Sequence, residues 1–251
     1  MDFMNEGNAP LGTILTQIEK KLNDSQISNE PFNHITFNID IDSKTINELF
    51  NIGRLKTEKK TVGRLEYDFP CHRSEEIIIN SIGKTIQKKL NLQLPTPAPP
   101  FNGLLLTSHR GLWIDDDSLN ILDIHLDYLR SESHWESVNV LDINNETQLG
   151  MSMHIYLPDD DMKSELGTSL YTVPEDVKKI MPDPPVSIPT MVEKIDEDKC
   201  NLVKTIPYIP GNIFIHATST DTWHQAPKVP KGYLRKSMMI RWVYNLVSIK
   251  N

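Results

Sequence analysis

The chain is poor in cysteine and has no long hydrophobic run. Only two of its 251 residues are cysteines, Cys71 and Cys200, which is too few for a disulfide framework or a multi-cysteine metal site. No stretch approaches the roughly 18 consecutive apolar residues of a membrane-spanning helix. The first residues lack the apolar core of a secretory signal. We therefore expect a cytoplasmic protein without a membrane partner.

Positive charge is also scarce. Lys and Arg number 26 against 34 Asp and Glu, and the net charge is −8. Such a chain lacks the basic field with which proteins hold nucleic acid, so we expect no nucleic-acid partner. A hydrophobic content of 38 % over this length is enough for a folded core of the size that enzymes have.

The first hundred residues carry apolar residues at helical spacing, as in the stripe of Leu11, Ile14, Ile18 and Leu22. Ser74 is a candidate N-cap for the third helix. We expect residues 1–100 to form a support region that does not fold independently. The segments that this spacing and one alternating run predict are helices at 11–24, 44–53 (with Ser43 as candidate cap) and 75–91 and a strand at 32–41.

Residues 101–251 have a different pattern, in which short apolar runs are separated by polar turns. Such a pattern is typical of an antiparallel sandwich or barrel. Segment 174–200 is rich in proline and charge and predicts a long loop inside this region. The fold class that we expect is mainly β with flanking helices, a barrel supported by N-terminal helices. The predicted strands are 103–108, 119–129, 149–157, 166–173, 201–209, 212–218 and 235–247.

Three residues of this half have the chemistry of a metal site. His125 and Asp127 are two apart on a predicted strand, so their side chains share one face. His224 lies next to another predicted strand. Two imidazoles and one carboxylate can take three positions around a metal and leave three open, as in non-haem iron(II) oxygenases. The alternative is that the H-x-D triplet arises by chance.

A second group suits a carboxylate ligand. Arg235 and Ser237 share one face of the last predicted strand, and a guanidinium can pair with a carboxylate in bidentate fashion. Arg241 on the same face is the rival for that role. Tyr156 lies on the strand after the H-x-D triplet, and its alternative role is that of a barrel-wall tyrosine.

The roles of the remaining histidines and of one acidic run are less specific. His154 shares the face of Tyr156, and it either contacts a cosubstrate or is a hydrogen-bonded interior residue. We expect His216 to be structural and His109 to lie in a loop or at the surface. The acidic run at 115–117 lacks the spacing of a calcium loop and predicts a solvated turn.

Taken in order, these pieces resemble a known family. Residues 119–247 are similar to the double-stranded β-helix (jelly-roll) barrel of the iron(II)- and 2-oxoglutarate-dependent dioxygenases, and especially to the prolyl-hydroxylase-like branch. The segments that carry the resemblance are His125-Leu126-Asp127, Tyr156-Leu157-Pro158-Asp159, Leu166-Gly167-Thr168-Ser169-Leu170, Pro207-Tyr208-Ile209-Pro210-Gly211, His224, and Arg235-Lys236-Ser237 running to Trp242.

The resemblance implies an enzyme that uses iron(II), 2-oxoglutarate and dioxygen. It implies hydroxylation of an amino-acid, peptidyl or other small organic substrate, with release of succinate and carbon dioxide. The implied iron ligands are His125, Asp127 and His224. The implied cosubstrate contacts are Arg235, which pairs with the distal carboxylate of 2-oxoglutarate, and the hydrogen-bonding candidates Tyr156 and Ser237.

Two other classes of protein stay open. One is a metal-binding barrel of cupin type with a different activity, although the H-x-H motif that cupins usually carry does not occur in the sequence. The other is a catalytically silent binding module, against which the intact set of candidate ligands argues. The sequence leaves the substrate and the oligomeric state open.

Overall fold

The computed structural model describes residues 10–54, 58–61, 63–68, 71–92, 94, 103–118, 124, 150–159, 163–178, 197–218 and 221–247. Two of the predicted site residues, His125 and Asp127, lie outside these ranges. The predicted strand 119–129 also lies outside them, except for Ile124, as does most of the predicted loop 174–200.

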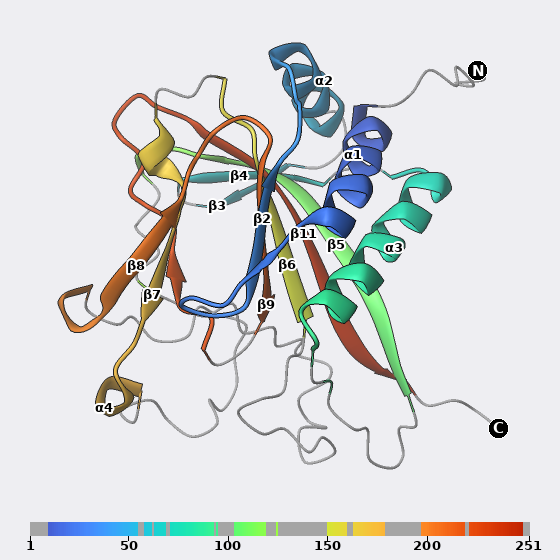
Figure 1. The fold of residues 1–251 in the computed structure, drawn as a ribbon. Coiled ribbons are helices and arrows are strands. Elements are labelled where there is room, and N and C mark those ends of the chain that lie inside the picture. Colours follow the sequence, from blue (N-terminus) through green and yellow to red (C-terminus); the bar gives the residue numbers. More distant parts are fainter. Residues whose placement is uncertain are drawn as a thin grey trace, which may run out of the picture.

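Two antiparallel sheets form the body of the protein (Figure 1). We call them the large and the small sheet. The large, eight-stranded sheet has the order β1 (Ile27–Ser28), β2 (His34–Asn38), β9 (Asn212–Thr218), β6 (Gly150–Tyr156), β11 (Arg235–Val247), β5 (Gly103–Asp115), β4 (Arg64–Asp68) and β3 (Glu58–Thr61). The small, three-stranded sheet has the order β10 (His224–Gln225), β7 (Thr168–Thr172) and β8 (Asn201–Ile206).

The chain passes repeatedly between the two sheets. It leaves the large sheet after β6, forms β7 and β8 of the small sheet, and returns to the large sheet in β9. It then crosses to β10 and back to β11. This alternation between two facing antiparallel sheets is that of a jelly-roll barrel. The expected fold class, mainly β with flanking helices, is confirmed.

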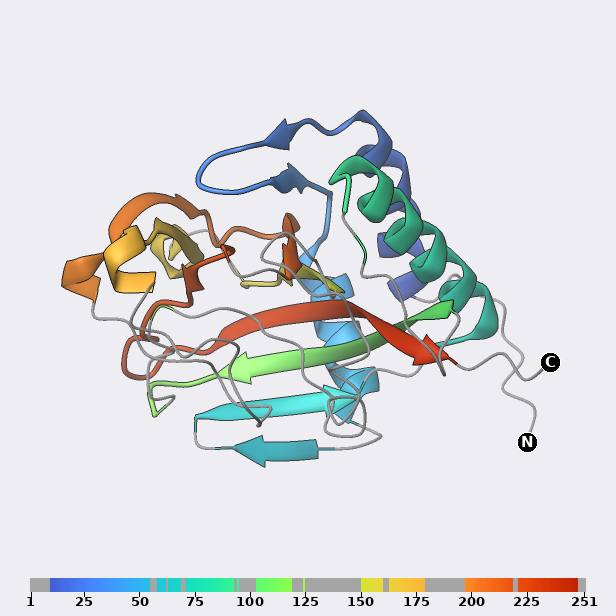
Figure 2. The same ribbon diagram turned by 90° about the horizontal axis from the view of Figure 1, so that it is seen from below.

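Helices cover the outer face of the large sheet. α1 (Pro10–Asp24) and α3 (Arg73–Lys89) lie side by side on it, and α2 (Ser43–Arg54) packs near α1 (Figures 1 and 2). Their apolar stripes join one core with inward residues of the sheet. The three helices predicted from periodicity are therefore confirmed. A one-turn helix, α4 (Glu175–Lys178), follows β7. No described helix is long and apolar enough to cross a membrane.

α3 begins at Arg73, with His72 as its N-cap, so the predicted cap Ser74 is wrong. The backbone N–H of His72 donates to the Glu75 carboxylate at 2.8 Å. The helix docks on Trp242 of β11, whose Nε1 donates to the Ile79 carbonyl at 3.2 Å. A Cβ on Gly83 would lie 2.6 Å from this nitrogen, so the glycine allows the close packing.

Strands from the first hundred residues complete both edges of the large sheet. β1 and β2 extend it beyond β9, while β3 and β4 extend it beyond β5 (Figure 2). The polar sequences of β3 and β4 did not predict strands. β5 continues to Asp115, well past the predicted end at 108, because it pairs with both β4 and β11 along this length. His109 therefore lies on a strand and not in a loop, and it is exposed at the surface, which was the other predicted position.

Candidate metal and cosubstrate site

The two faces of the large sheet differ in chemistry. Successive side chains of a strand point to opposite faces. On β11, Met238, Ile240 and Trp242 belong to the core beneath the helices. Arg235 and Ser237 alternate with them and therefore face the small sheet. The space between the sheets thus receives the polar residues that the sequence predicts for a ligand site.

His224 points into this inter-sheet space. It pairs directly with Leu170 of β7, so the two side chains share one face of the small sheet. Leu170 belongs to a buried cluster that contains Tyr156 and Phe214 of the large sheet. His224 itself is only 4 % exposed. The predicted distal metal ligand is therefore an inward-facing, buried imidazole.

The hydrogen bond of His224 defines its tautomer. Nδ1 lies 2.8 Å from the carbonyl oxygen of Thr222. Because a carbonyl can only accept, Nδ1 carries a proton, and in the neutral form of the ring the lone pair then resides on Nε2. An imidazole held in this way by a backbone carbonyl is the usual form of a metal-binding histidine.

The other two predicted iron ligands, His125 and Asp127, lie outside the described residues, but the residue before them is described. Ile124 is fully buried and forms one cluster with Tyr171, Val173 and Trp223. Tyr171 follows Leu170 on β7, so this cluster lies on the outer face of the small sheet. Within the described part of the chain, no three histidine, cysteine or acidic side chains gather into a metal-binding group.

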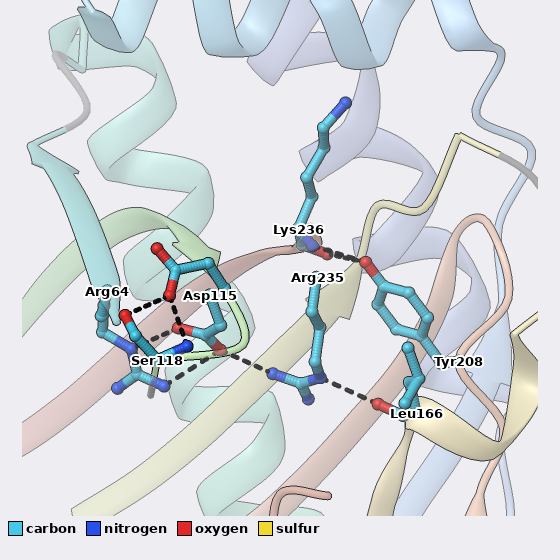
Figure 3. A network of polar contacts seen from close by, with 8 residues as sticks. Arg64, Asp115, Ser118, Leu166, Tyr208, Arg235 and Lys236 are labelled. Carbon is cyan, nitrogen blue, oxygen red and sulfur yellow. Dashed lines mark hydrogen bonds and ion pairs between the residues drawn. The ribbon is translucent and has the colours of Figure 1, made fainter. Parts of the chain in front are cut away.

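Arg235 is buried at the start of β11 and makes polar contacts with two residues of the described part of the chain (Figure 3). Nε donates to the Leu166 carbonyl at 2.8 Å, and Nη1 donates to Oδ2 of Asp115 at 3.2 Å. Its Cζ lies 5.6 Å from the ring centroid of Tyr156 and 5.5 Å from that of Tyr208. Arg235 is thus a buried cation held between a carboxylate, a carbonyl and two aromatic rings.

Tyr156 and Ser237 lie beside Arg235, as their positions in sequence predict. Ser237 is 1 % exposed and pairs directly with Tyr156 across β11 and β6. The Tyr156 hydroxyl donates to Oγ1 of Thr168 at 2.6 Å. Burial raises the pKa of Tyr156, although the Arg235 charge opposes the rise. The hydroxyl is therefore neutral, and it is held by a partner that the sequence did not indicate.

Two motif glycines bring the loops against this site. A Cβ on Gly167 would overlap the carbonyl oxygen of Ile206, so only glycine fits there. This close approach positions Leu166, whose carbonyl holds Arg235. Gly211 has a φ of +72°, and a Cβ there would overlap the carbonyl of Ile39. The turn glycines of the sequence motif therefore have a packing role.

Asp115 was missed by sequence reasoning, which placed it in a solvated turn. The structure shows that this prediction is wrong, because the side chain is completely buried. Its Oδ1 accepts from Nε of Arg64 at 2.6 Å, and its Oδ2 accepts from Arg235. Asp116 accepts from the backbone N–H and the hydroxyl of Ser118, which lies in the turn after β5.

Two interior histidines lie near His224. The ring of His216 is 4.9 Å from that of His224, centroid to centroid, although the sequence indicated only a structural role for it. The ring of His154 stacks on His216 at 5.7 Å with an interplanar angle of 9°. His216 lies on the inner face of β9 and pairs with Ser152 of β6. His154 lies on the inner face of β6 and pairs with Phe214 of β9. An aromatic and imidazole wall therefore adjoins the candidate metal ligand.

Solved structures similar to this chain include members of the 2OG-Fe(II) oxygenase family. One is an oxidoreductase of that family from Burkholderia pseudomallei, which is 10 % identical, covers 95 % of this chain and 91 % of its own, and has a TM-score of 0.42. Another is a prolyl hydroxylase from Trichoplax adhaerens in complex with a hypoxia-inducible-factor peptide, with 9 % identity, 95 % and 94 % coverage and a TM-score of 0.45. A prolyl-4-hydroxylase from Pseudomonas putida has 12 % identity, 91 % and 98 % coverage and a TM-score of 0.43.

No family model matches the chain, and no curated protein matches it. The sequence motifs resemble the iron(II)- and 2-oxoglutarate-dependent oxygenases and their prolyl-hydroxylase-like branch. The solved structures to which the chain is similar include a member of that family and two prolyl hydroxylases.

Proposed function

We propose that the protein is an iron(II)- and 2-oxoglutarate-dependent oxygenase. The observation that carries this proposal is the placement of His224, a buried imidazole that points between the sheets with its lone pair on Nε2. In the proposed site, His224, His125 and Asp127 hold the iron. Two neutral imidazoles and one hard carboxylate are ligands that suit iron(II) and leave three positions open.

The cluster around Ile124 supports the placement of His125 and Asp127. Ile124 and Trp223 share one cluster on the outer face of the small sheet, and each directly precedes a proposed histidine ligand. In an extended chain, the residue after an outward one points inward. On this ground we include His125, which follows Ile124 in the sequence, in the proposed ligand set together with Asp127.

Arg235 supports the cosubstrate part of the proposal. It is a buried guanidinium on the same inner face as Ser237 and near Tyr156. Its planar array of donors suits the distal carboxylate of 2-oxoglutarate. Ser237 offers a hydroxyl to the same group. Because the Tyr156 hydroxyl donates to Thr168, it can receive a hydrogen bond but has its own proton engaged.

The chain's residues have distinct roles in this account. Iron and 2-oxoglutarate together supply the oxidative chemistry, in which 2-oxoglutarate is converted to succinate and carbon dioxide while dioxygen is consumed. The chain orients both groups and excludes water, since the inner residues Tyr156, Leu170 and Phe214 are fully buried. With the carboxylate of Asp127 in the ligand set, we propose hydroxylation of an amino-acid, peptidyl or other small organic substrate.

Iron-dependent formation of succinate from 2-oxoglutarate tests the proposal. We expect turnover by the full chain with iron(II) and ascorbate, stimulated further by a correct substrate from a panel of amino acids and peptides. His224→Gln should abolish it. His109→Gln is the matched control, because it removes an exposed histidine on β5. If the wild-type protein neither binds nor converts 2-oxoglutarate, it is instead a cupin-type barrel or a silent binding module.

A further inference from the structure

Three charged residues lie in one row across three adjacent strands. Asp115 of β5 pairs directly with Arg64 of β4 on one side and with Arg235 of β11 on the other. The carboxylate accepts from Arg64 at 2.6 Å and from Arg235 at 3.2 Å. The side chain of Asp115 is 0 % exposed, that of Arg235 4 % and that of Arg64 18 %. The row therefore forms a largely buried ionic cluster.

The charges of this cluster do not cancel. Among the described residues, two guanidinium groups surround a single carboxylate, which leaves one positive charge in excess at a largely buried place. An uncompensated buried charge is costly, so the arrangement favours an additional anion beside it. Arg64 is also held by a second contact, because its Cζ lies 4.1 Å from the ring centroid of Trp113.

The contacts of Arg235 indicate where such an anion would bind. Nε donates a hydrogen bond to the Leu166 carbonyl, and Nη1 donates one to the Asp115 carboxylate. No contact of Arg235 with a described residue uses its third nitrogen, Nη2. Figure 3 shows this nitrogen directed away from Leu166 and Asp115. Asp115 thus takes one side of the guanidinium and leaves another side for a ligand.

We propose that Asp115 is the positioning residue of the cosubstrate site, with Arg64 as its counter-cation. The proposal rests on the proposed function, in which Arg235 binds the distal carboxylate of 2-oxoglutarate. Asp115 holds Nη1, so the guanidinium presents Nη2 to the ligand in a constant orientation. Without the negative charge, Arg64 and Arg235 would repel each other, and Arg235 would leave this orientation. Arg64 keeps Asp115 neutralised, so the carboxylate does not repel the ligand.

Calorimetric titration of 2-oxoglutarate into the anaerobic iron(II)-loaded protein tests this role without turnover. Asp115→Asn keeps the size of the side chain and removes its charge. We expect its Kd for 2-oxoglutarate to rise by about tenfold, as is typical when the partner of a ligand-binding group is lost. In steady state, KM for 2-oxoglutarate should rise while kcat changes by less than about twofold. Iron(II) affinity should stay the same.

Asp159→Asn is the matched control. It also neutralises an aspartate next to the start of β11, but one that is 61 % exposed and paired with Lys236. Its Kd for 2-oxoglutarate should equal that of the wild type. Arg64→Gln gives an independent test if Asp115→Asn does not fold. It removes the excess positive charge while Arg235 stays intact, so it should also weaken 2-oxoglutarate binding.

The outcomes separate this inference from the proposed function. If the wild-type protein does not bind 2-oxoglutarate, the proposed function fails. If the wild type binds and both variants bind equally well, Asp115 has only a structural role and the inference is wrong. Tighter binding by Asp115→Asn would also overturn it, because the carboxylate would then compete with the ligand rather than position its partner.

Discussion

Ile124 and Trp223 belong to the same buried cluster, although nearly one hundred residues separate them in the sequence. Each directly precedes a histidine that the sequence motifs assign to an iron site. Since Trp223 lies on the outer face of the small sheet, His224, which follows it, is directed to the opposite face. For His224 the structure shows this inward direction directly, through its pairing with Leu170.

Replacing Arg235 with lysine should weaken the binding of 2-oxoglutarate by tenfold or more. Lysine keeps the charge but lacks the planar array of donors of a guanidinium. It therefore cannot donate to Leu166, to Asp115 and to a ligand carboxylate at the same time in a fixed geometry. The dissociation constant measured by calorimetry under anaerobic conditions checks this. Arg241→Lys is the control, because Arg241 lies on the same face of β11. A large effect of Arg241→Lys with a small effect of Arg235→Lys would reassign the carboxylate contact.

Gly167→Ala should destabilise the fold by about 3 kcal/mol, the upper end of the cost of forcing extra atoms into a packed site. The added Cβ would overlap the Ile206 carbonyl, and the loop that carries Leu166 would have to move. Urea unfolding measures the loss. Gly232→Ala is the matched control, since its φ of +78° is strained for alanine but nothing lies within 4 Å of the added atom. It should cost about 1 kcal/mol. Equal losses in both variants would contradict the close packing at Gly167.

Stability should decrease as the pH falls below about 6.5, the ordinary pKa of histidine. Burial lowers the pKa of His34, and the nearby charge of Lys204 lowers it further, against the hydrogen bond to the Phe32 carbonyl. The unfolded chain therefore binds this proton more readily than the folded one, and protonation favours unfolding. Part of the free energy of unfolding is thus lost as the pH falls through the lowered pKa.

Urea unfolding at several pH values between 5 and 8 checks this expectation for His34→Gln and for His109→Gln. The first variant should show a flatter dependence of stability on pH than the wild type. The second replaces an exposed histidine and should follow the wild type. A wild-type dependence that persists in His34→Gln would assign the effect to another group.

Cys71 should react slowly with alkylating reagents in the folded protein. Burial raises the pKa of its thiol to about 11, although the charge of Arg110 opposes the rise. At pH 8 only about a thousandth of the thiol is then ionised, and the thiolate is the reactive form. Peptide mapping after iodoacetamide treatment should show Cys71 labelled at least tenfold faster in urea than in buffer. Equal rates would show that the thiol is not held in this environment.

Helices and strands whose apolar residues recur at a regular spacing were predictable from the sequence. The apolar stripe from Leu11 to Leu22 predicted α1, and the run at 212–218 predicted β9 with the bounds that the structure shows. Local patterns of this kind depend only on which face of an element is buried. The inner-face grouping of Arg235 and Ser237 followed from the same two-residue period.

The site features that depend on strand pairing were not predictable. The sequence predicted an acidic turn at Asp115, because nothing local shows that β4 and β11 place Arg64 and Arg235 beside it. The same holds for Thr168, which accepts from Tyr156, and for His216, which lies against His224. In each case the partner is distant in sequence, and its identity depends on the register of the sheets.

Iron(II) binding under anaerobic conditions tests the central claim most directly. Equilibrium dialysis should give one iron(II) per chain for the wild type, and Asp127→Ala should lower the affinity by about a hundredfold, since one of three protein ligands is lost. Asp159→Ala, which removes an exposed aspartate, should leave the affinity unchanged. Wild-type affinity in Asp127→Ala, or no stoichiometric iron binding by the wild type, would contradict the proposed site.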